Sequence, residues 1–148
     1  MIYLIILAIT ILFLLNGLII YSLKRMNGSG KNEYNPVNIS IIIAAKNEAE
    51  KIDTLVESIT NLNYPVEMFE VILVDDNSTD GTYEKLKLKT KPYINFSVLE
   101  LKSILSSGKR EALSFGIKNS KYPYILITDA DCKPQSNWLN AYSRKFNA

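Results

Sequence analysis

The chain has 148 residues, with 17 Lys and Arg against 15 Asp and Glu, for a formal net charge of +2. This length excludes a large multidomain assembly. The small net charge also differs from that of proteins that bind nucleic acid mainly through phosphate contacts, which carry a strong basic excess. The absence of His excludes every mechanism that needs an imidazole, and the single Cys132 excludes an intrachain disulfide and a cysteine metal cluster.

The first 23 residues carry no charged side chain. A helix of that length is about 35 Å long, enough to cross a hydrocarbon core of about 30 Å, so 1–23 is predicted to be a transmembrane helix. A cleaved secretory signal would need a basic leader and a small-residue cleavage site, which the segment lacks. Lys24 and Arg25 follow the helix, so the positive-inside rule predicts a single-pass membrane protein with a cytoplasmic C-terminal domain, where a free Cys132 is stable.

The segment after the predicted helix is polar and contains Gly28, Ser29 and Gly30. This composition predicts a flexible linker over 24–36. One domain is then predicted over 37–148, because its length suffices for a single small hydrophobic core.

The predicted domain alternates strands with helices. Short apolar, β-branched runs predict strands at 38–45, 69–74, 94–101 and 124–128. Helical spacing of apolar residues predicts helices at 52–62, 107–119 and 138–146, and a further helix, second in chain order, is predicted to run through about Lys89.

Polar residues predict how two of these helices begin. Asn47 and Glu50 have the spacing of a capping box for the first helix, and Ser78 or Asp80 is placed to cap the second. The order of elements predicts an α/β fold with a mostly parallel sheet and helices on both faces. Ligands of such sheets bind beyond the carboxyl ends of the strands, where the polar clusters of this sequence lie.

The segment ITDADC places Asp129 and Asp131 at the end of a predicted strand. Alternate residues of extended backbone share a face, so the two carboxylates are predicted to point into one volume, where their repulsion favours a cation. Oxygen ligands suit magnesium or manganese, which often bind substrate phosphates as well. The alternative is that both residues cap a helix or fill a turn, as a lone DxD often does.

Two further clusters strengthen the metal interpretation. Asp75 and Asp76 end a predicted strand, where a carboxylate can accept a hydrogen bond from a base or a ribose. Residues 77–81 are interpreted as turn and cap residues. Ser106, Ser107, Gly108, Lys109 and Arg110 lie at a predicted helix start, where backbone N–H groups and Lys109 favour an anion; a solvated helix face is the alternative.

Four segments occur in an order that resembles a known family: AAKNEAEKI, VILVDDNSTDGT, SGKREALSFGI and YILITDADCKPQSNWL. Together they resemble the nucleotide-binding half of family 2 glycosyltransferases with the A-type fold. The resemblance covers about residues 38 to 146. It implies a glycosyltransferase that uses a nucleotide-sugar and acts in the synthesis of cell-envelope polysaccharide.

The resemblance also implies roles for the residues that match the family motifs. Asp76 resembles the carboxylate that meets the uracil edge of a UDP-sugar, with Asp75 beside it in the pocket. Ala45 and Lys46 resemble the stretch along the base and ribose, and Glu48 is grouped with these substrate-binding residues.

The phosphate side of the implied site comes from the later motifs. Lys109 resembles the family lysine near the diphosphate, and Asp129 and Asp131 resemble the family DxD. The last Asp of that motif binds the divalent metal, and the first lies toward the ribose and the metal shell. The resemblance implies inversion at the anomeric carbon and a glycan or lipid-type acceptor.

The family continues into an acceptor-binding half that supplies the general base, and no residue here matches that base. The chain is therefore expected to be C-terminally truncated, with a separate C-terminal half as one partner. Two other functions stay open. One is a non-catalytic module that binds a nucleotide-sugar or a partner. The other is a phosphohydrolase of the haloacid dehalogenase type with Asp129 as nucleophile, although Lys133 departs from that motif. A dinucleotide oxidoreductase is disfavoured because no GxGxxG follows the first strand.

Overall fold

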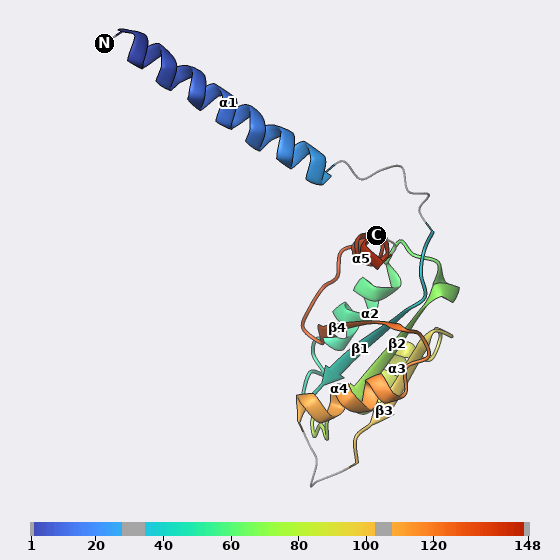
Figure 1. Ribbon diagram of the computed structural model, residues 1–148. Helices are drawn as coiled ribbons and strands as arrows, with labels where there is room; N and C mark the ends of the chain where they lie inside the picture. The colour runs from blue at the N-terminus through green and yellow to red at the C-terminus, as the bar shows by residue number, and fades with distance from the viewer. Residues whose placement is uncertain (1, 28–34, 103–107, 147–148) are drawn as a thin grey trace. The chain divides into compact units, whose positions relative to one another are not determined.

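The computed structural model describes residues 2–27, 35–102 and 108–146. The chain divides into two compact units, Met1–Tyr34 and Asn35–Ala148. Figure 1 shows a helix in the first unit and a sheet surrounded by helices in the second. All residues predicted to form the functional site lie in the second unit.

The first unit contains helix α1 (Ile2–Asn27). The predicted N-terminal helix is present, and it extends into the segment predicted as a linker, of which 28–34 lies outside the described residues. The side-chain amide of Asn16 donates to the Leu12 carbonyl at 2.8 Å, so a polar group lies within the apolar segment. Among the helices of the described residues, none combines the length and the apolarity needed to cross a membrane. This finding overturns the predicted transmembrane anchor, the single-pass membrane localisation and the cytoplasmic placement of the C-terminal domain.

The second unit is built on a four-stranded parallel sheet in the order β3-β2-β1-β4. The strands are β1 (Ile39–Ala45), β2 (Phe69–Asp75), β3 (Phe96–Glu100) and β4 (Tyr124–Asp129). The two central strands, β1 and β2, are almost entirely buried. Their sequences, ISIIIAA and FEVILVD, are nearly continuous apolar runs because both faces of a central parallel strand are covered. The predicted α/β class and parallel sheet are confirmed.

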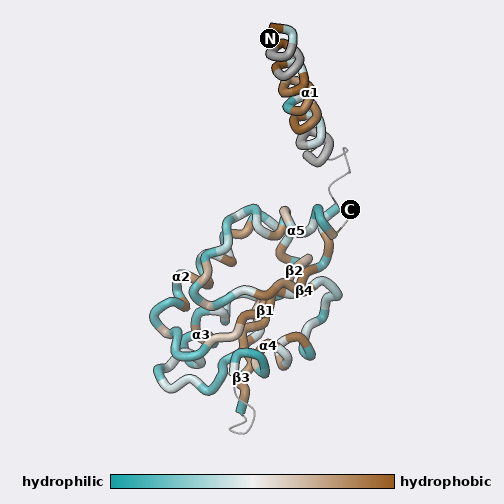
Figure 2. Tube along the Cα trace, turned by 60° about the vertical axis from the view of Figure 1, so that its left-hand side comes forward, coloured by the Kyte–Doolittle hydropathy of each residue, from teal (hydrophilic) through white to brown (hydrophobic). Residues whose placement is uncertain are grey.

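Helices cover both faces of the sheet. The larger core lies between the sheet and α2 (Ile52–Thr60), α3 (Thr82–Thr90) and α5 (Trp138–Phe146). On the opposite face, α4 (Lys109–Lys118) packs on β1 and β2 over a smaller cluster. Figure 2 shows the apolar strands between these two layers. A short 3-10 helix, η1 (Val66–Met68), precedes β2.

The helix starts differ in detail from the predictions. Lys51 occupies the cap position of α2 without a side-chain hydrogen bond that caps the helix, so the predicted capping box is wrong. The side chain of Asn47 instead accepts from the Thr79 N–H at 2.9 Å. Gly81 caps α3 in the left-handed region, with φ 86°, and the preceding Asp80 accepts from the Thr82 N–H at 3.0 Å. The predicted anion-binding residues Ser106 and Ser107 lie outside the described residues.

Candidate functional site

The order of the strands determines where a ligand site can form. The chain passes from β1 to β2 and β3 on one side, and β4 then pairs with the other edge of β1. The register pairs Ala45 with Asp75, and Ala44 with Asp129. The carboxyl ends of β1, β2 and β4 therefore lie side by side. In open α/β sheets the crevice at such a reversal of strand order is the usual place for a ligand.

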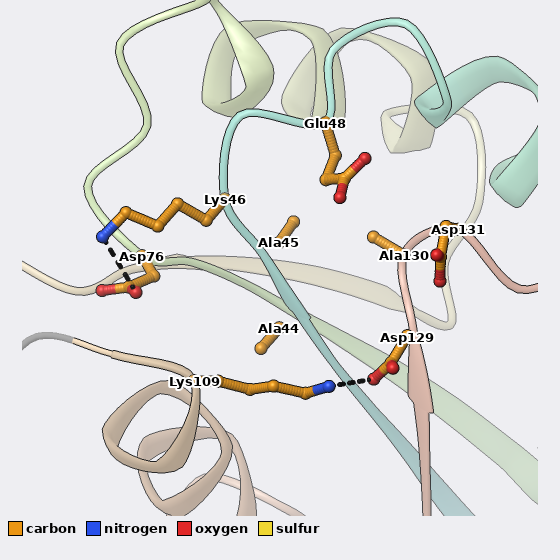
Figure 3. Close-up of a pocket in the computed structure, with 9 residues that line it drawn as sticks. All are labelled: Ala44, Ala45, Lys46, Glu48, Asp76, Lys109, Asp129, Ala130 and Asp131. Atoms are coloured by element: carbon orange, nitrogen blue, oxygen red, sulfur yellow. Dashed lines mark hydrogen bonds and ion pairs between the residues drawn. The ribbon is translucent and has the colours of Figure 1, made fainter.

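A cavity of about 210 Å³ lies at this position. Figure 3 shows its lining residues, which are Ala44, Ala45, Lys46, Glu48, Asp76, Lys109, Asp129, Ala130 and Asp131. Four carboxylates thus face two ammonium groups, so the lining carries a net negative charge. Sites for drug-sized ligands span roughly 300–1,000 Å³, so this cavity can enclose only part of such a ligand.

Asp76 connects three elements of the site. Its carboxylate is 2% exposed and lies beyond the end of β2. One oxygen, Oδ1, accepts from the Gly108 N–H at 3.0 Å, and the other, Oδ2, pairs with Lys46 Nζ at 3.3 Å. Through Oδ1, Asp76 therefore links the end of β2 to the backbone just before α4. Its other oxygen, Oδ2, faces Lys46.

Asp75 faces the opposite side of the sheet. It follows Val71 and Leu73 in the alternation of β2, and those side chains belong to the larger core beneath α2 and α3. Asp75 Oδ2 accepts from the Ser78 N–H at 3.1 Å, whereas the buried Oδ1 has no partner among the described residues. Asp75 does not line the cavity, so the structure separates it from Asp76 instead of placing both in the pocket.

Asp129 and Lys109 form the shortest ion pair in the cavity. Lys109 Nζ lies 2.6 Å from Asp129 Oδ1, and the pair joins the start of α4 to the end of β4 (Figure 3). The hydrogen bond to Asp129 raises the pKa of the Lys109 ammonium above its usual value, against a smaller opposing effect of desolvation. The first carboxylate of the DxD segment therefore already has a cationic partner.

Asp131 lines the cavity because of a turn after β4, whereas the sequence spacing predicts extended backbone there. The strand ends at Asp129, and Ala130 and Asp131 form a turn in which the Cys132 N–H donates to the Asp129 carbonyl at 3.1 Å. Both carboxylates of the DxD segment line the same cavity through this turn, not through continued extended backbone.

The donor set fits a divalent ion that is held together with a phosphate ligand. Within residues 2–27, 35–102 and 108–146, no three His, Cys, Asp or Glu side chains are grouped to hold a metal alone. Asp129 and Asp131 provide carboxylate oxygens at the cavity. Magnesium commonly takes one or two carboxylates and completes its coordination with water and substrate phosphates.

The residues after β1 line the other wall of the cavity. Glu48 pairs with Lys51 Nζ at 2.7 Å, and the Ala45 carbonyl accepts from the Asp76 N–H at 2.9 Å. The side chain of Lys46 is 52% exposed and leans over Asp76 (Figure 3). The backbone at Ala45 is therefore fixed to the end of β2, and the Lys46 ammonium remains open to solvent.

A set of hydrogen bonds, here called the loop clamp, joins the loops after β1 and β2. Three successive N–H groups of the first loop each donate to a side chain of the second loop or of the first residue of α3. These bonds run from Asn47 to Ser78 Oγ at 2.9 Å, from Glu48 to Thr82 Oγ1 at 2.9 Å and from Ala49 to Asp80 Oδ2 at 3.1 Å.

The backbone at the loop clamp is locally strained. Asn47 and Asn77 have positive φ angles of 54° and 53°, a region that residues other than glycine rarely adopt. Such conformations persist where the surrounding contacts determine them. The loop clamp provides those contacts, and it fixes the backbone that carries Lys46 and Glu48 into the cavity.

Sequence reasoning did not identify several of these contacts. Ala44 and Ala130 also line the cavity, Ala44 through the register of β1 with its neighbours and Ala130 through the turn after β4. The bond between Gly108 and Asp76 joins residues 32 positions apart and had no sequence signal. The sequence predicts only turn and cap roles for residues 77–81, whereas in the structure Ser78 and Asp80 also hold the first loop.

The sequence matches a known family along most of its length. Residues 40–148 match the family model described as Glycosyl transferase family 2. The chain is 34% identical over 101 residues to Glycosyltransferase AglE of Haloferax volcanii, covering 68% of this chain and 33% of that protein. The chain spans about a fifth to a third of the length of curated relatives that it matches.

Solved structures resemble the fold. The mannosyltransferase PcManGT from Pyrobaculum calidifontis, in complex with GDP-Man and Mn²⁺, superposes with a TM-score of 0.66 at 26% identity, over 85% of this chain and 38% of that one. S. aureus TarS 1-349, in complex with UDP-GlcNAc, superposes with a TM-score of 0.65 at 25% identity, over 75% and 31% of the two chains.

Proposed function

The chain belongs to glycosyl transferase family 2, and from this membership we propose that its cavity binds a sugar donor linked to a nucleoside diphosphate, with UDP as the nucleotide. The proposed enzyme transfers the sugar with inversion to a glycan or lipid-type acceptor in the cell envelope. The phosphohydrolase alternative is dropped, because the matching family is one of glycosyl transferases and because AglE and PcManGT are a glycosyltransferase and a mannosyltransferase.

The observation that carries the proposal is the charge of the cavity at the reversal of strand order. Four carboxylates and two lysines line it, so a diphosphate alone would be repelled by a net negative wall. A divalent cation removes that repulsion, and carboxylate oxygens suit magnesium or manganese. The GDP-Man and Mn²⁺ bound by PcManGT support this pairing of ligands, and the UDP-GlcNAc bound by TarS supports uracil as the base.

The base and ribose are assigned to the wall formed by β1 and β2. Asp76 Oδ2 faces Lys46 and keeps a lone pair for a base N–H, which is the role proposed for it. Ala45 and Lys46 flank the base and ribose, with Glu48 beside them on the same wall. Asp75 is assigned to the support of the loop through Ser78, because it lies outside the cavity lining.

The diphosphate is assigned to the wall formed by α4 and β4. Lys109 begins α4, where its ammonium and the positive end of the helix both favour phosphate oxygens. Asp131 is proposed as the principal metal ligand, with Asp129 toward the ribose and the metal shell. The bound ion would offset the negative charge that develops on the leaving nucleoside diphosphate.

The proposed reaction is a single displacement. The acceptor oxygen bonds to the anomeric carbon as the bond from that carbon to the diphosphate oxygen breaks. The acceptor proton passes to a general base, and we assign that role to no residue of this chain. The chain's own contribution is to hold the donor and to stabilise its leaving group.

A panel of sugar nucleotides tests the identity of the donor. With manganese present, UDP-glucose and UDP-N-acetylglucosamine should raise the unfolding temperature of the full chain, since a ligand at 100 times its Kd adds about 2.7 kcal/mol to the free energy of unfolding. GDP-mannose should raise it less. Asp76→Asn should reduce the response to the uridine donors. An equal response to GDP-mannose would refute the preference for uridine, and no response to any donor would refute the proposed function.

The loop clamp predicts an effect of Thr82→Val on both stability and donor binding. The Thr82 hydroxyl is buried, accepts from the Glu48 N–H and donates to Asp80 Oδ1 at 2.6 Å. Valine keeps the shape but leaves the Glu48 N–H without its acceptor, while Asp80 Oδ1 still accepts from the backbone N–H of residue 82, so the free energy of unfolding should fall by about 1–3 kcal/mol. Donor affinity, measured by calorimetry, should fall several-fold because Glu48 and Lys46 lose their fixed backbone.

Thr90→Val is the matched control. Thr90 is buried in the same helix, but its hydroxyl donates only to the carbonyl of Leu86, at 2.8 Å. This variant should lose stability and keep the donor affinity of the unmodified chain. Equal losses of affinity in both variants would show that the loop clamp does not position the site.

A further inference from the structure

The ion pair between Lys109 and Asp129 occupies a carboxylate that the proposed function also needs for the metal. Lys109 Nζ lies 2.6 Å from Asp129 Oδ1. A divalent ion bound to the same oxygen at about 2.0–2.1 Å would lie within roughly 5 Å of the ammonium. Two cations at this separation repel each other. The pair and the metal therefore compete for Asp129.

The ion pair between Lys109 and Asp129 can break at little cost. The side chains of Lys109 and Asp129 are 60% and 48% exposed, and exposed ion pairs are weak because solvent screens them. The backbone before Lys109 is fixed, since the Gly108 N–H donates to Asp76 Oδ1 at 3.0 Å. The long side chain can thus move its ammonium between two partners while the start of α4 stays in place.

The position of Lys109 also identifies its second partner. Lys109 is the first residue of α4, and the amino end of a helix disfavours a cation unless an anion lies beside it. Asp129 supplies that anion in the structure. When Asp129 binds a metal instead, a phosphate group at the same helix end can supply the anion beside Lys109.

Resting on the proposed function, we infer that Lys109 and Asp129 form a cation-exchange pair. Without a ligand, Lys109 holds Asp129 and fills the place of the cation. When the divalent ion binds Asp129, Lys109 leaves the carboxylate and binds the diphosphate that arrives with the ion. The chain therefore binds the metal–nucleotide complex more tightly than the free metal. Only the complex provides both a cation for Asp129 and a phosphate for Lys109.

The inference predicts opposite effects of Lys109→Met on two affinities. The affinity of the full chain for manganese alone, measured from the electron paramagnetic resonance signal of the free ion, should rise roughly fivefold, because no ammonium competes for Asp129. The affinity for UDP at saturating manganese, measured by calorimetry, should fall roughly tenfold, because the charged contact to phosphate is lost. A role of Lys109 in phosphate binding alone would change only the second affinity.

Two variants serve as controls. Lys118→Met removes the same charge from the exposed last turn of α4 and should change the manganese affinity by less than about twofold, since that charge is screened. Lys109→Arg keeps a cation beside Asp129 and should bind manganese as the unmodified chain does. A far-UV circular dichroism spectrum matching that of the unmodified chain establishes that each variant is folded.

An unchanged or reduced manganese affinity in Lys109→Met overturns the exchange. An equal rise of the affinity in Lys118→Met overturns it as well, because a general charge effect would then explain both variants. The manganese titration contains no nucleotide, so it tests the competition for Asp129 whether or not the chain binds a nucleotide. A chain that shows this competition but binds no UDP with manganese contradicts the proposed function instead.

Discussion

Asp131→Asn is expected to reduce the affinity for UDP in the presence of manganese by roughly 100-fold. Substitutions of groups that only support metal ligands already cost about 10- to 100-fold in metal affinity, so loss of the proposed principal ligand should cost at least as much. Asp131 lines the cavity and forms no ion pair among the described residues, so its charge is available to a cation. Calorimetric titration of UDP at saturating manganese measures the loss directly.

Asp53→Asn is the control for this prediction. It removes the same charge by the same substitution, but Asp53 pairs with Lys85 and Lys89 at 2.7 and 2.6 Å, away from the cavity lining. The affinity of this variant for UDP should match that of the unmodified chain. If the two variants lose equal affinity, net charge would explain the effect and Asp131 would lose its proposed role.

Gly116→Ala is expected to lower the free energy of unfolding by about 1–3 kcal/mol, the usual cost of overfilling a packed core. Gly116 is buried where α4 crosses β1 and β2. A Cβ atom there would lie 2.5 Å from Ile42 Cγ2 and 3.1 Å from Val74 Cγ2. Both contacts are with buried side chains of central strands, which have little room to move. The helix can approach the sheet this closely only without a side chain at 116.

The sign of this effect is informative because helix propensity predicts the opposite. Alanine in a helix interior is favoured over glycine by about 1 kcal/mol. Ser114→Ala in the same helix is the control, since Ser114 is exposed and the change should be neutral or slightly stabilising. Denaturant unfolding of both variants measures the difference. A more stable Gly116→Ala variant would show that α4 lies farther from the sheet than the structure places it.

The central strands and the position of the site were predictable from the sequence because they depend on local patterns. A continuous apolar run such as that of β1 fits a strand buried on both faces, and polar residues that end such runs meet at one edge of a parallel sheet. That reasoning placed Asp76, Lys109, Asp129 and Asp131 together, and the structure brings all four to one cavity.

Other features of the structure do not follow from local patterns. Asp75 is the last residue of β2 and lies on the side of the larger core, whereas Asp76 lies beyond the strand and lines the cavity, and the sequence does not say which of the two does so. Asn47 had the spacing of a helix cap, yet its side chain bonds to a loop 32 residues away. The apolar composition of 1–23 predicted a membrane span that the described helices do not provide.

The central claim is that one acidic cavity binds a nucleoside diphosphate only with a divalent cation. Calorimetric titration of UDP into the unmodified full chain, with and without manganese, tests it most directly. The account predicts clear binding with manganese and at least about tenfold weaker binding without it, since the cavity wall alone repels the diphosphate. Equal affinity in the two titrations, or no binding in either, would contradict it.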